Sequence, residues 1–139
     1  MRLYLDANPI IYSIEGVPEF RAAALAWIER AEAASGAVIT SRLSRLECRV
    51  KPLRDGNTEL LTRFEGFFAR EGLDLAEITP EVVETATALR AAHGFRPPDA
   101  IHLATAVLAK DDVFLTGDRN LARCPGLKVE VLAGPRGVS

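Results

Sequence analysis

The chain has 139 residues, of which 48% are hydrophobic and 26% charged; this mixture is typical of a folded globular domain and excludes a disordered or fibrous chain. Its length predicts one domain over residues 1–133, followed by a flexible tail over residues 134–139. The formal net charge of −2 excludes a generally basic surface, so any contact with nucleic acid would need a local patch.

Short apolar runs alternate with longer helical patterns along the chain. The runs cover residues 2–5, 37–40, 113–116 and 128–132, with a weaker fifth run over residues 73–78. Helical periodicity covers residues 18–34, 57–70, 80–92 and 98–109, and a further helix opens near Ser41. This alternation predicts an α/β fold with three layers, α/β/α, around a central, mainly parallel sheet of four or five strands.

The sequence contains neither a membrane span nor a signal for secretion. No apolar run approaches the ~20 residues that a membrane-spanning helix needs, and the chain begins directly with a strand-like run. The two cysteines, Cys48 and Cys124, form no C-x-x-C pair, which predicts reduced, structural thiols. We therefore expect a cytoplasmic protein with no membrane contact.

Two aspartates follow predicted strands. Asp6 closes the first strand, and Asp118 follows residues 113–116 after a single glycine. Because ligands of parallel α/β sheets bind outside the carboxyl ends of the strands, both aspartates are expected at one rim of the sheet. For either aspartate alone, a role in a turn or a helix cap explains the residue equally well.

Two further acids are predicted at the same rim. Glu47 shares a helical stripe with Leu43, Leu46 and Val50, where an acid needs a cation or hydrogen bonds unless its head reaches solvent at the edge of the stripe. Asp99 begins the strongly apolar helix over residues 98–109, where capping alone would also explain it.

Four carboxylates in one place require a compensating charge. At an effective dielectric constant of 20, two carboxylates ~5 Å apart repel each other by about 3 kcal/mol. A purely oxygen ligand set, with Asp6, Asp99 and Asp118 on the metal, suits Mg²⁺ or Mn²⁺. Such ions activate water and neutralise phosphate oxygens, so the four acids predict a nuclease.

Three arginines form a possible site for phosphates. Arg42, Arg45 and Arg49 recur at helical spacing on the segment that carries Glu47. They are expected to bind the phosphates of a nucleic acid, although a charged helix face that is merely solvated remains the alternative.

Four motifs together resemble those of the PIN-domain family, specifically the small VapC-like ribonuclease toxins of toxin–antitoxin pairs. The motifs lie at residues 5–12, 41–47, 98–106 and 115–120 and span nearly the whole chain. Each motif is weak alone, whereas their order and spacing are specific.

The resemblance implies a metal-dependent endoribonuclease. Its four family acids match Asp6, Glu47, Asp99 and Asp118. Two flanking polar positions match Asn8 and Thr116, and Asn120 lies where some members carry a further polar or acidic residue. The resemblance also implies a homodimer that is neutralised by a small antitoxin. The helix around Phe64 to Phe68 is a candidate interface, but core packing is the simpler explanation of its phenylalanines.

Other roles are weighed against this one. His102 follows Asp99 by three residues and invites a metal-ligand interpretation, which we reject because the other proposed ligands are hard oxygens and His102 is expected mid-helix among apolar residues. A haloacid-dehalogenase-like phosphatase usually needs D-x-D, whereas this chain reads Asp6-Ala7-Asn8. A non-catalytic interaction module with a vestigial acidic pocket is the remaining alternative.

Overall fold

A computed structural model of the chain describes residues 1–132, so the predicted tail at residues 134–139 lies outside the described residues. Five strands form one sheet: β1 (Arg2–Leu5), β2 (Ala37–Ser41), β3 (Leu73–Ala76), β4 (Val113–Thr116) and β5 (Val129–Val131). Their order is β3-β2-β1-β4-β5, and all four pairings are parallel. The weakest predicted strand, β3, is therefore present at the edge of a five-stranded parallel sheet.

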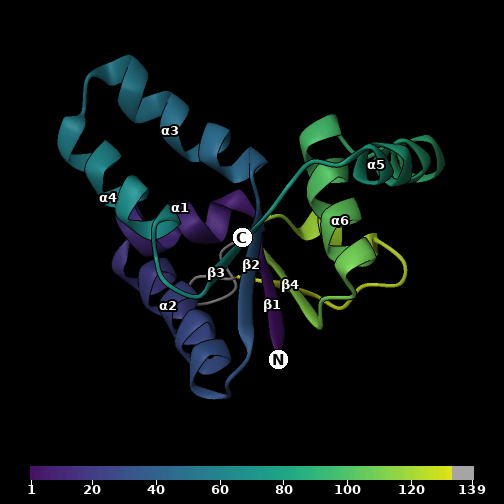
Figure 1. Cartoon of the computed structure of the whole chain (residues 1–139), viewed down its shortest axis with the longest axis horizontal. Helices are drawn as coiled ribbons and strands as arrows, with labels where there is room; N and C mark the ends of the chain where they lie inside the picture. The colour runs from purple at the N-terminus through teal and green to yellow at the C-terminus, as the bar shows by residue number, and fades with distance from the viewer. Residues whose placement is uncertain (133–139) are drawn as a thin grey trace.

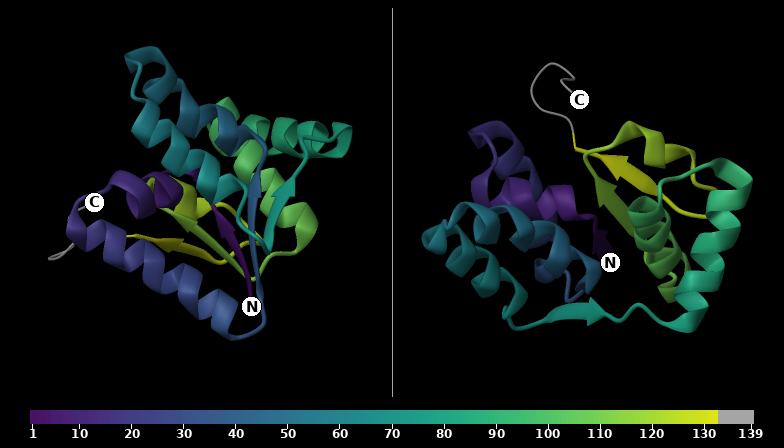
Figure 2. Two further views of the ribbon diagram at one scale, coloured as in Figure 1. Left: turned by 60° about the vertical axis from the view of Figure 1, so that its left-hand side comes forward. Right: turned by 90° about the horizontal axis from the view of Figure 1, so that it is seen from above.

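Helices cover both faces of this sheet, as Figure 1 shows, and Figure 2 shows the same division from two further sides. One side carries α1 (Ala7–Glu15), α2 (Pro18–Ala33) and the hairpin of α3 (Leu43–Asp55) with α4 (Thr58–Phe68). The other side carries α5 (Pro80–His93) and α6 (Pro97–Ala109). A 3₁₀ helix, η1 (Arg119–Arg123), connects β4 to β5. The predicted three-layer α/β/α architecture is confirmed.

The strand sequences explain why both faces are covered. Side chains alternate between the two faces of a strand, and in β1 Leu3 and Leu5 belong to one buried cluster while Tyr4 belongs to the other. Phe114 of β4 lies on the Tyr4 side and stacks on its ring with centroids 5.1 Å apart. Both faces of the central strands are thus apolar, as a parallel sheet between two helical layers requires.

Helix α1 is absent from the sequence predictions, which leave open whether Asp6 takes part in a turn or caps a helix. Asp6 caps α1, and Pro9 occupies its first turn. A proline is tolerated there because the first backbone N–H groups of a helix have no partner within the helix. The chain consequently turns from β1 directly into a helix, which fixes the Asp6 carboxylate at the rim.

The predicted apolar stripe of α3 proves to be on the surface. Leu46 and Val50 are 58% and 48% exposed, and Leu53, one turn further, is 58% exposed. The buried side of α3 consists of Ser44, Cys48 and Pro52. The prediction that Glu47 lies on a buried stripe is therefore wrong, because the periodicity of α3 identifies an apolar face but not what covers it.

The phenylalanines of α4 belong to the core. Phe64, Phe67 and Phe68 are at most 9% exposed, so they offer no free surface to a partner. Both cysteines are free and buried, as predicted, and burial raises the pKa of the Cys48 thiol to about 12. Within residues 1–132, no helix has the length and apolar character that a membrane span requires.

Candidate active site

Asp6 lies at the carboxyl end of β1 and is 5% exposed. Its Oδ1 accepts a hydrogen bond of 2.8 Å from the Ala7 N–H, and its Oδ2 accepts one of 2.7 Å from the Thr116 hydroxyl. The Asp6 N–H donates to the Leu115 carbonyl at 3.0 Å, which joins the end of β1 to β4. Both carboxylate oxygens are thus held in place by neighbouring elements.

Thr116 links Asp6 to Asp118. While its hydroxyl donates to Asp6, the same oxygen accepts a hydrogen bond of 3.1 Å from the Asp118 N–H. Asp118 caps η1, because its Oδ1 accepts from the Asn120 N–H at 2.9 Å. The Asn120 side chain instead accepts a hydrogen bond from Arg123. Asn120 therefore contributes its backbone to this rim, and its side chain faces Arg123.

The start of α3 is fixed by hydroxyl groups at the end of β2. Thr40 donates to the Leu5 carbonyl at 2.7 Å and forms a hydrogen bond of 2.7 Å with the Ser44 hydroxyl. Ser41 Oγ accepts from the Leu43 N–H at 3.0 Å, which gives the helix a side-chain cap that Arg42 does not supply. These bonds hold α3 beside β1, so that Glu47, one turn along, reaches the rim.

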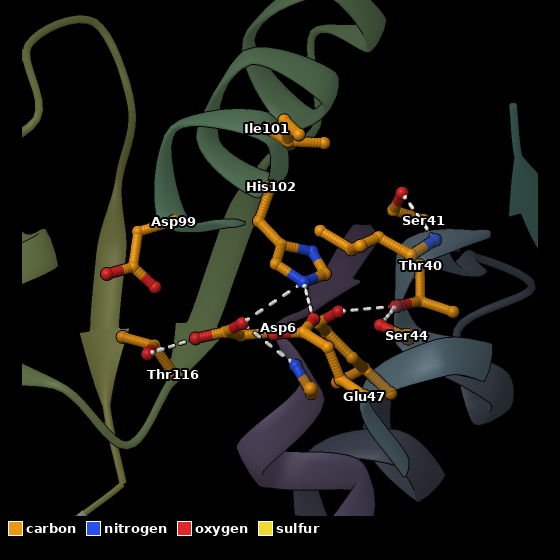
Figure 3. Close-up of polar contacts among 12 residues, drawn as sticks. Asp6, Thr40, Ser41, Ser44, Glu47, Asp99, Ile101, His102 and Thr116 are labelled. Atoms are coloured by element: carbon orange, nitrogen blue, oxygen red, sulfur yellow. Dashed lines mark hydrogen bonds and ion pairs between the residues drawn. The ribbon is translucent and has the colours of Figure 1, made fainter. Parts of the chain in front are cut away.

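His102 joins these elements at the centre of the site, contrary to its predicted place among apolar residues. Its Nε2 is 2.6 Å from Glu47 Oε1 and 3.6 Å from Asp6 Oδ1, while its Nδ1 is 2.6 Å from the Tyr4 hydroxyl. Figure 3 shows Asp6 and Glu47 converging on the His102 ring from two different elements. Burial lowers the pKa of His102, but the hydrogen bond to Glu47 and the charges of Asp6, Glu47 and Asp99 raise that pKa overall.

A signal for His102 is present in the sequence. It follows Asp99 by three residues, and residues three apart share one face of a helix. On a helix that is buried almost all round, that face carries both polar groups to the same side.

Asp99 occupies the first turn of α6 and is 9% exposed. Arg96 Nε lies 3.2 Å from its Oδ2. Burial raises the pKa of Asp99, Arg96 opposes that shift, and the charges of Asp6 and Asp118 raise the pKa further. In Figure 3 Asp99 lies beside Asp6 and Thr116. The three aspartates are therefore close enough to interact electrostatically.

The four predicted acids come from the ends of β1 and β4 and from α3 and α6, and they gather at one rim of the sheet. Glu47 is partly open to solvent, with 27% of its side chain exposed. Within residues 1–132, no three His, Cys, Asp or Glu side chains are already arranged to coordinate one ion. Carboxylate oxygens gathered at one rim nevertheless fit Mg²⁺ or Mn²⁺, since magnesium retains several waters and takes few direct protein ligands.

The three arginines of α3 are engaged with glutamates. Arg42 forms two hydrogen bonds with Glu77, at 2.7 and 2.6 Å. Arg45 lies 3.0 Å and Arg49 3.9 Å from the same carboxylate oxygen of Glu65. Each arginine thus has a nearby acid within the fold.

Glu47 and these arginines lie on different sides of α3. Arg45 and Arg49 are each two residues from Glu47, which is about 200° around a helix. The acids and the basic stripe therefore do not form one continuous surface across this helix.

Asn8, in the first turn of α1, is exposed.

Comparisons with known structures reveal the same fold in several proteins. VapBC2 from Rickettsia felis, bound to a DNA fragment from its promoter, has a TM-score of 0.75 at 14% identity and covers 94% of this chain and 98% of its own. A toxin–antitoxin complex from Klebsiella pneumoniae has a TM-score of 0.72 at 24% identity, with coverage of 95% and 98%. VapC20 from Mycobacterium tuberculosis, a Sarcin-Ricin loop cleaving toxin, has a TM-score of 0.70 at 14% identity, with coverage of 91% and 98%.

No curated protein sequence matches the chain. The family model of the PIN domain, in contrast, matches residues 3–127. This range contains all four acids of the rim, together with Tyr4, His102 and Thr116. Because this match spans most of the chain, the chain belongs to the PIN-domain family rather than to the haloacid-dehalogenase family of the phosphatase alternative.

Proposed function

We propose that the chain is a metal-dependent endoribonuclease that hydrolyses RNA phosphodiester bonds, and that it is the toxin of a VapBC-like toxin–antitoxin pair. The observation that carries the proposal is the gathering of Asp6, Glu47, Asp99 and Asp118 at one rim. Membership of the PIN-domain family and the fold shared with VapC20, a toxin that cleaves the Sarcin-Ricin loop, support it.

The residues of the rim suit distinct tasks in this reaction. Asp6, Asp99 and Asp118 would hold Mg²⁺ or Mn²⁺, and Glu47 is the fourth acid. The bound ion supplies an activated water and neutralises charge on the phosphate. Thr116 orients Asp6 through its hydroxyl and Asp118 through its backbone. We assign auxiliary roles to Asn8, Thr116 and Asn120.

The proposed partner is a small antitoxin. Toxin–antitoxin complexes are among the structures that share this fold. On this chain, Leu46, Val50 and Leu53 of α3 form an exposed apolar stripe, and a groove beside it is lined by Leu46, Ile78 and the three arginines. We propose that an antitoxin segment with apolar and acidic side chains covers this stripe. A homodimer and a cytoplasmic location are further proposals, the first testable by sedimentation and the second by fractionation of cells.

Cleavage by the purified chain tests this function. The chain, freed of any partner, is incubated with total RNA and, separately, with single-stranded DNA, in Mn²⁺ and in EDTA, and new RNA ends are mapped. We expect RNA cleavage that requires the metal, and we expect this activity to elute with the protein during its purification. Folded, metal-loaded protein that leaves RNA intact would contradict the proposal and favour the non-catalytic interaction module.

A further inference from the structure

Two polar side chains lie deep under the carboxylates and are connected to them. Tyr4 and His102 are both 0% exposed. The Tyr4 hydroxyl is 2.6 Å from His102 Nδ1, and His102 Nε2 is 2.6 Å from Glu47 Oε1. Two short hydrogen bonds thus run from the middle of β1, through α6, to the acid on α3. The roles proposed above use neither Tyr4 nor His102.

The proton on the His102 ring can be placed by its neighbours. Nε2 faces two carboxylates, Glu47 at 2.6 Å and Asp6 at 3.6 Å, and an ionised carboxylate only accepts hydrogen bonds. Nε2 must therefore carry the proton, whether the ring is neutral or charged. The Tyr4 hydroxyl fits both states, because it donates to a neutral Nδ1 and accepts from a protonated one.

This arrangement determines what His102 can do. With a proton on Nε2 and Tyr4 against Nδ1, neither ring nitrogen offers a free lone pair to a metal ion. The ring instead holds one oxygen of Glu47, which leaves the other oxygen for the site. Since a long glutamate side chain that is 27% exposed has several accessible rotamers, fixing it requires such a partner.

We infer that Tyr4 and His102 position the Glu47 carboxylate for the reaction, with His102 as the hydrogen-bond donor and Tyr4 as the group that sets the ring orientation. The inference rests on the proposed function, since it concerns the same site. His102 acts through Glu47, so it is a positioning residue. Partners of this kind, one shell outside a metal site, typically change metal affinity or activity by 10–100-fold when they are removed.

The first experiment examines the protein without metal. Long-range proton–nitrogen NMR spectra of the histidine rings, assigned with His102→Gln, report which ring nitrogen carries a proton. We expect a proton on Nε2 of His102 whose signal shifts in Glu47→Ala. A bare Nε2, or a signal that Glu47→Ala leaves unchanged, would overturn the inference. This result does not depend on whether the protein cleaves RNA.

The second experiment separates positioning from simple packing. His102→Leu and His102→Gln are made in the wild-type and Glu47→Ala backgrounds, and both Mn²⁺ affinity and RNA cleavage are measured. In the wild-type background we expect His102→Leu to lower one or both by about 10–100-fold, and His102→Gln, which retains a donor near Nε2, to lose less. In Glu47→Ala the same change should cost less than about twofold, because interacting residues are not additive.

Equal losses in both backgrounds would show that His102 only fills space, and would overturn the inference while leaving the proposed nuclease standing. If wild-type protein with bound Mn²⁺ cleaves no RNA, the proposed function fails, and the NMR signal and Mn²⁺ affinity still decide the role of His102. Should His102→Leu fail to fold, the comparison of His102→Gln across the two backgrounds replaces it, with the same two outcomes.

Discussion

At the amino end of β1 and β4, one arginine contacts two acids, whereas at the carboxyl end of the same strands four acids gather. Arg2 Nε lies 2.9 Å from Asp111 Oδ1, and the Arg2 N–H donates to Asp112 at 2.6 Å. At the other end, the charges of Asp6 and Asp118 act on Asp99, and the opposing Arg96 side chain is 77% exposed. The two ends of the sheet therefore differ in how many acids gather there.

The two ends share one property, a buried carboxyl group with a raised pKa. Burial raises the pKa of Asp99, and burial also raises the pKa of Asp111. Each carboxyl group also has an arginine that lowers its pKa, Arg2 for Asp111 and Arg96 for Asp99, and neighbouring acids that raise it. A buried acid with a raised pKa is thus insufficient to identify a site, and what distinguishes the carboxyl end is the number of acids that gather there.

The largest expected effect separates the two ends by activity. Asp6→Asn should lower metal-dependent RNA cleavage by at least about a hundredfold, since losing a ligand should cost no less than losing an outer partner. Asp111→Asn, the matched control at the amino end, should cleave within about twofold of the wild type. Both rates are measured on the same RNA, with circular dichroism to verify folding. Equal losses of RNA cleavage in the two folded variants would contradict the assignment of the reaction to the carboxyl end of the sheet.

A second effect concerns stability with and without metal. Asp99→Asn should raise the melting temperature of the metal-free protein, because it removes a buried charge that faces other carboxylates. Metal at 100 times its Kd raises the free energy of unfolding by about 2.7 kcal/mol. Wild type and Asp111→Asn should gain this stabilisation, and Asp99→Asn should gain less. Scanning calorimetry in EDTA and in Mn²⁺ measures it, and an equal gain in all three proteins would place the metal elsewhere.

A smaller effect concerns the amino end and the way in which the free energy of unfolding depends on pH. The pKa of Asp111 is raised from 3.8 by burial, so as pH falls from 7 the folded protein takes up a proton before the unfolded chain does. Unfolding free energy of the wild type should therefore rise relative to that of Asp111→Asn, until the pH falls below 3.8. Urea titrations between pH 7 and pH 4 measure this difference. A change in the opposite direction would mean that Arg2 outweighs burial.

The smallest expected effect extends the comparison to α3, where basic groups are already paired with acids. Changing Arg42, Arg45 and Arg49 together to Gln should flatten the salt dependence of RNA binding, with each lost phosphate contact contributing about 0.7 to the slope on a single strand. Glu65 and Glu77 compete with phosphates for these arginines. We therefore expect the slope to change by much less than the loss of three phosphate contacts would produce. An unchanged slope would show that the stripe is only a solvated face.

The sequence predicts the architecture well because its signals are local and periodic. Apolar runs and helical spacing place the five strands and most of the helices, and the strand-end position of Asp6 and Asp118 places them at one rim. Helix α1 escapes prediction because Asn8-Pro9 reads equally as a turn, and only the contacts of Asp6 show that a helix follows.

The site itself depends on contacts between distant segments, which no local pattern reports. Glu47 was assigned to the rim on the ground of a buried stripe, yet Leu46 and Val50 are exposed. Hydrogen bonds between β1, β2 and the start of α3 bring Glu47 to the rim, and a further one ties it to His102, 55 residues away. His102 was placed among apolar residues for the same reason, since the periodicity of α6 predicts its burial and says nothing of the carboxylates it faces.

The central claim is that the acids at the carboxyl end of the sheet hold the metal ion, and anomalous diffraction from crystals soaked in Mn²⁺ tests it most directly. The account predicts a manganese peak within coordination distance, roughly 2.0–2.3 Å, of carboxylate oxygens of Asp6 and Asp99, or joined to them through water. It also predicts that the peak disappears in Asp6→Asn crystals. A peak beside Asp111 and Asp112, or no peak at the rim at saturating Mn²⁺, would contradict the account.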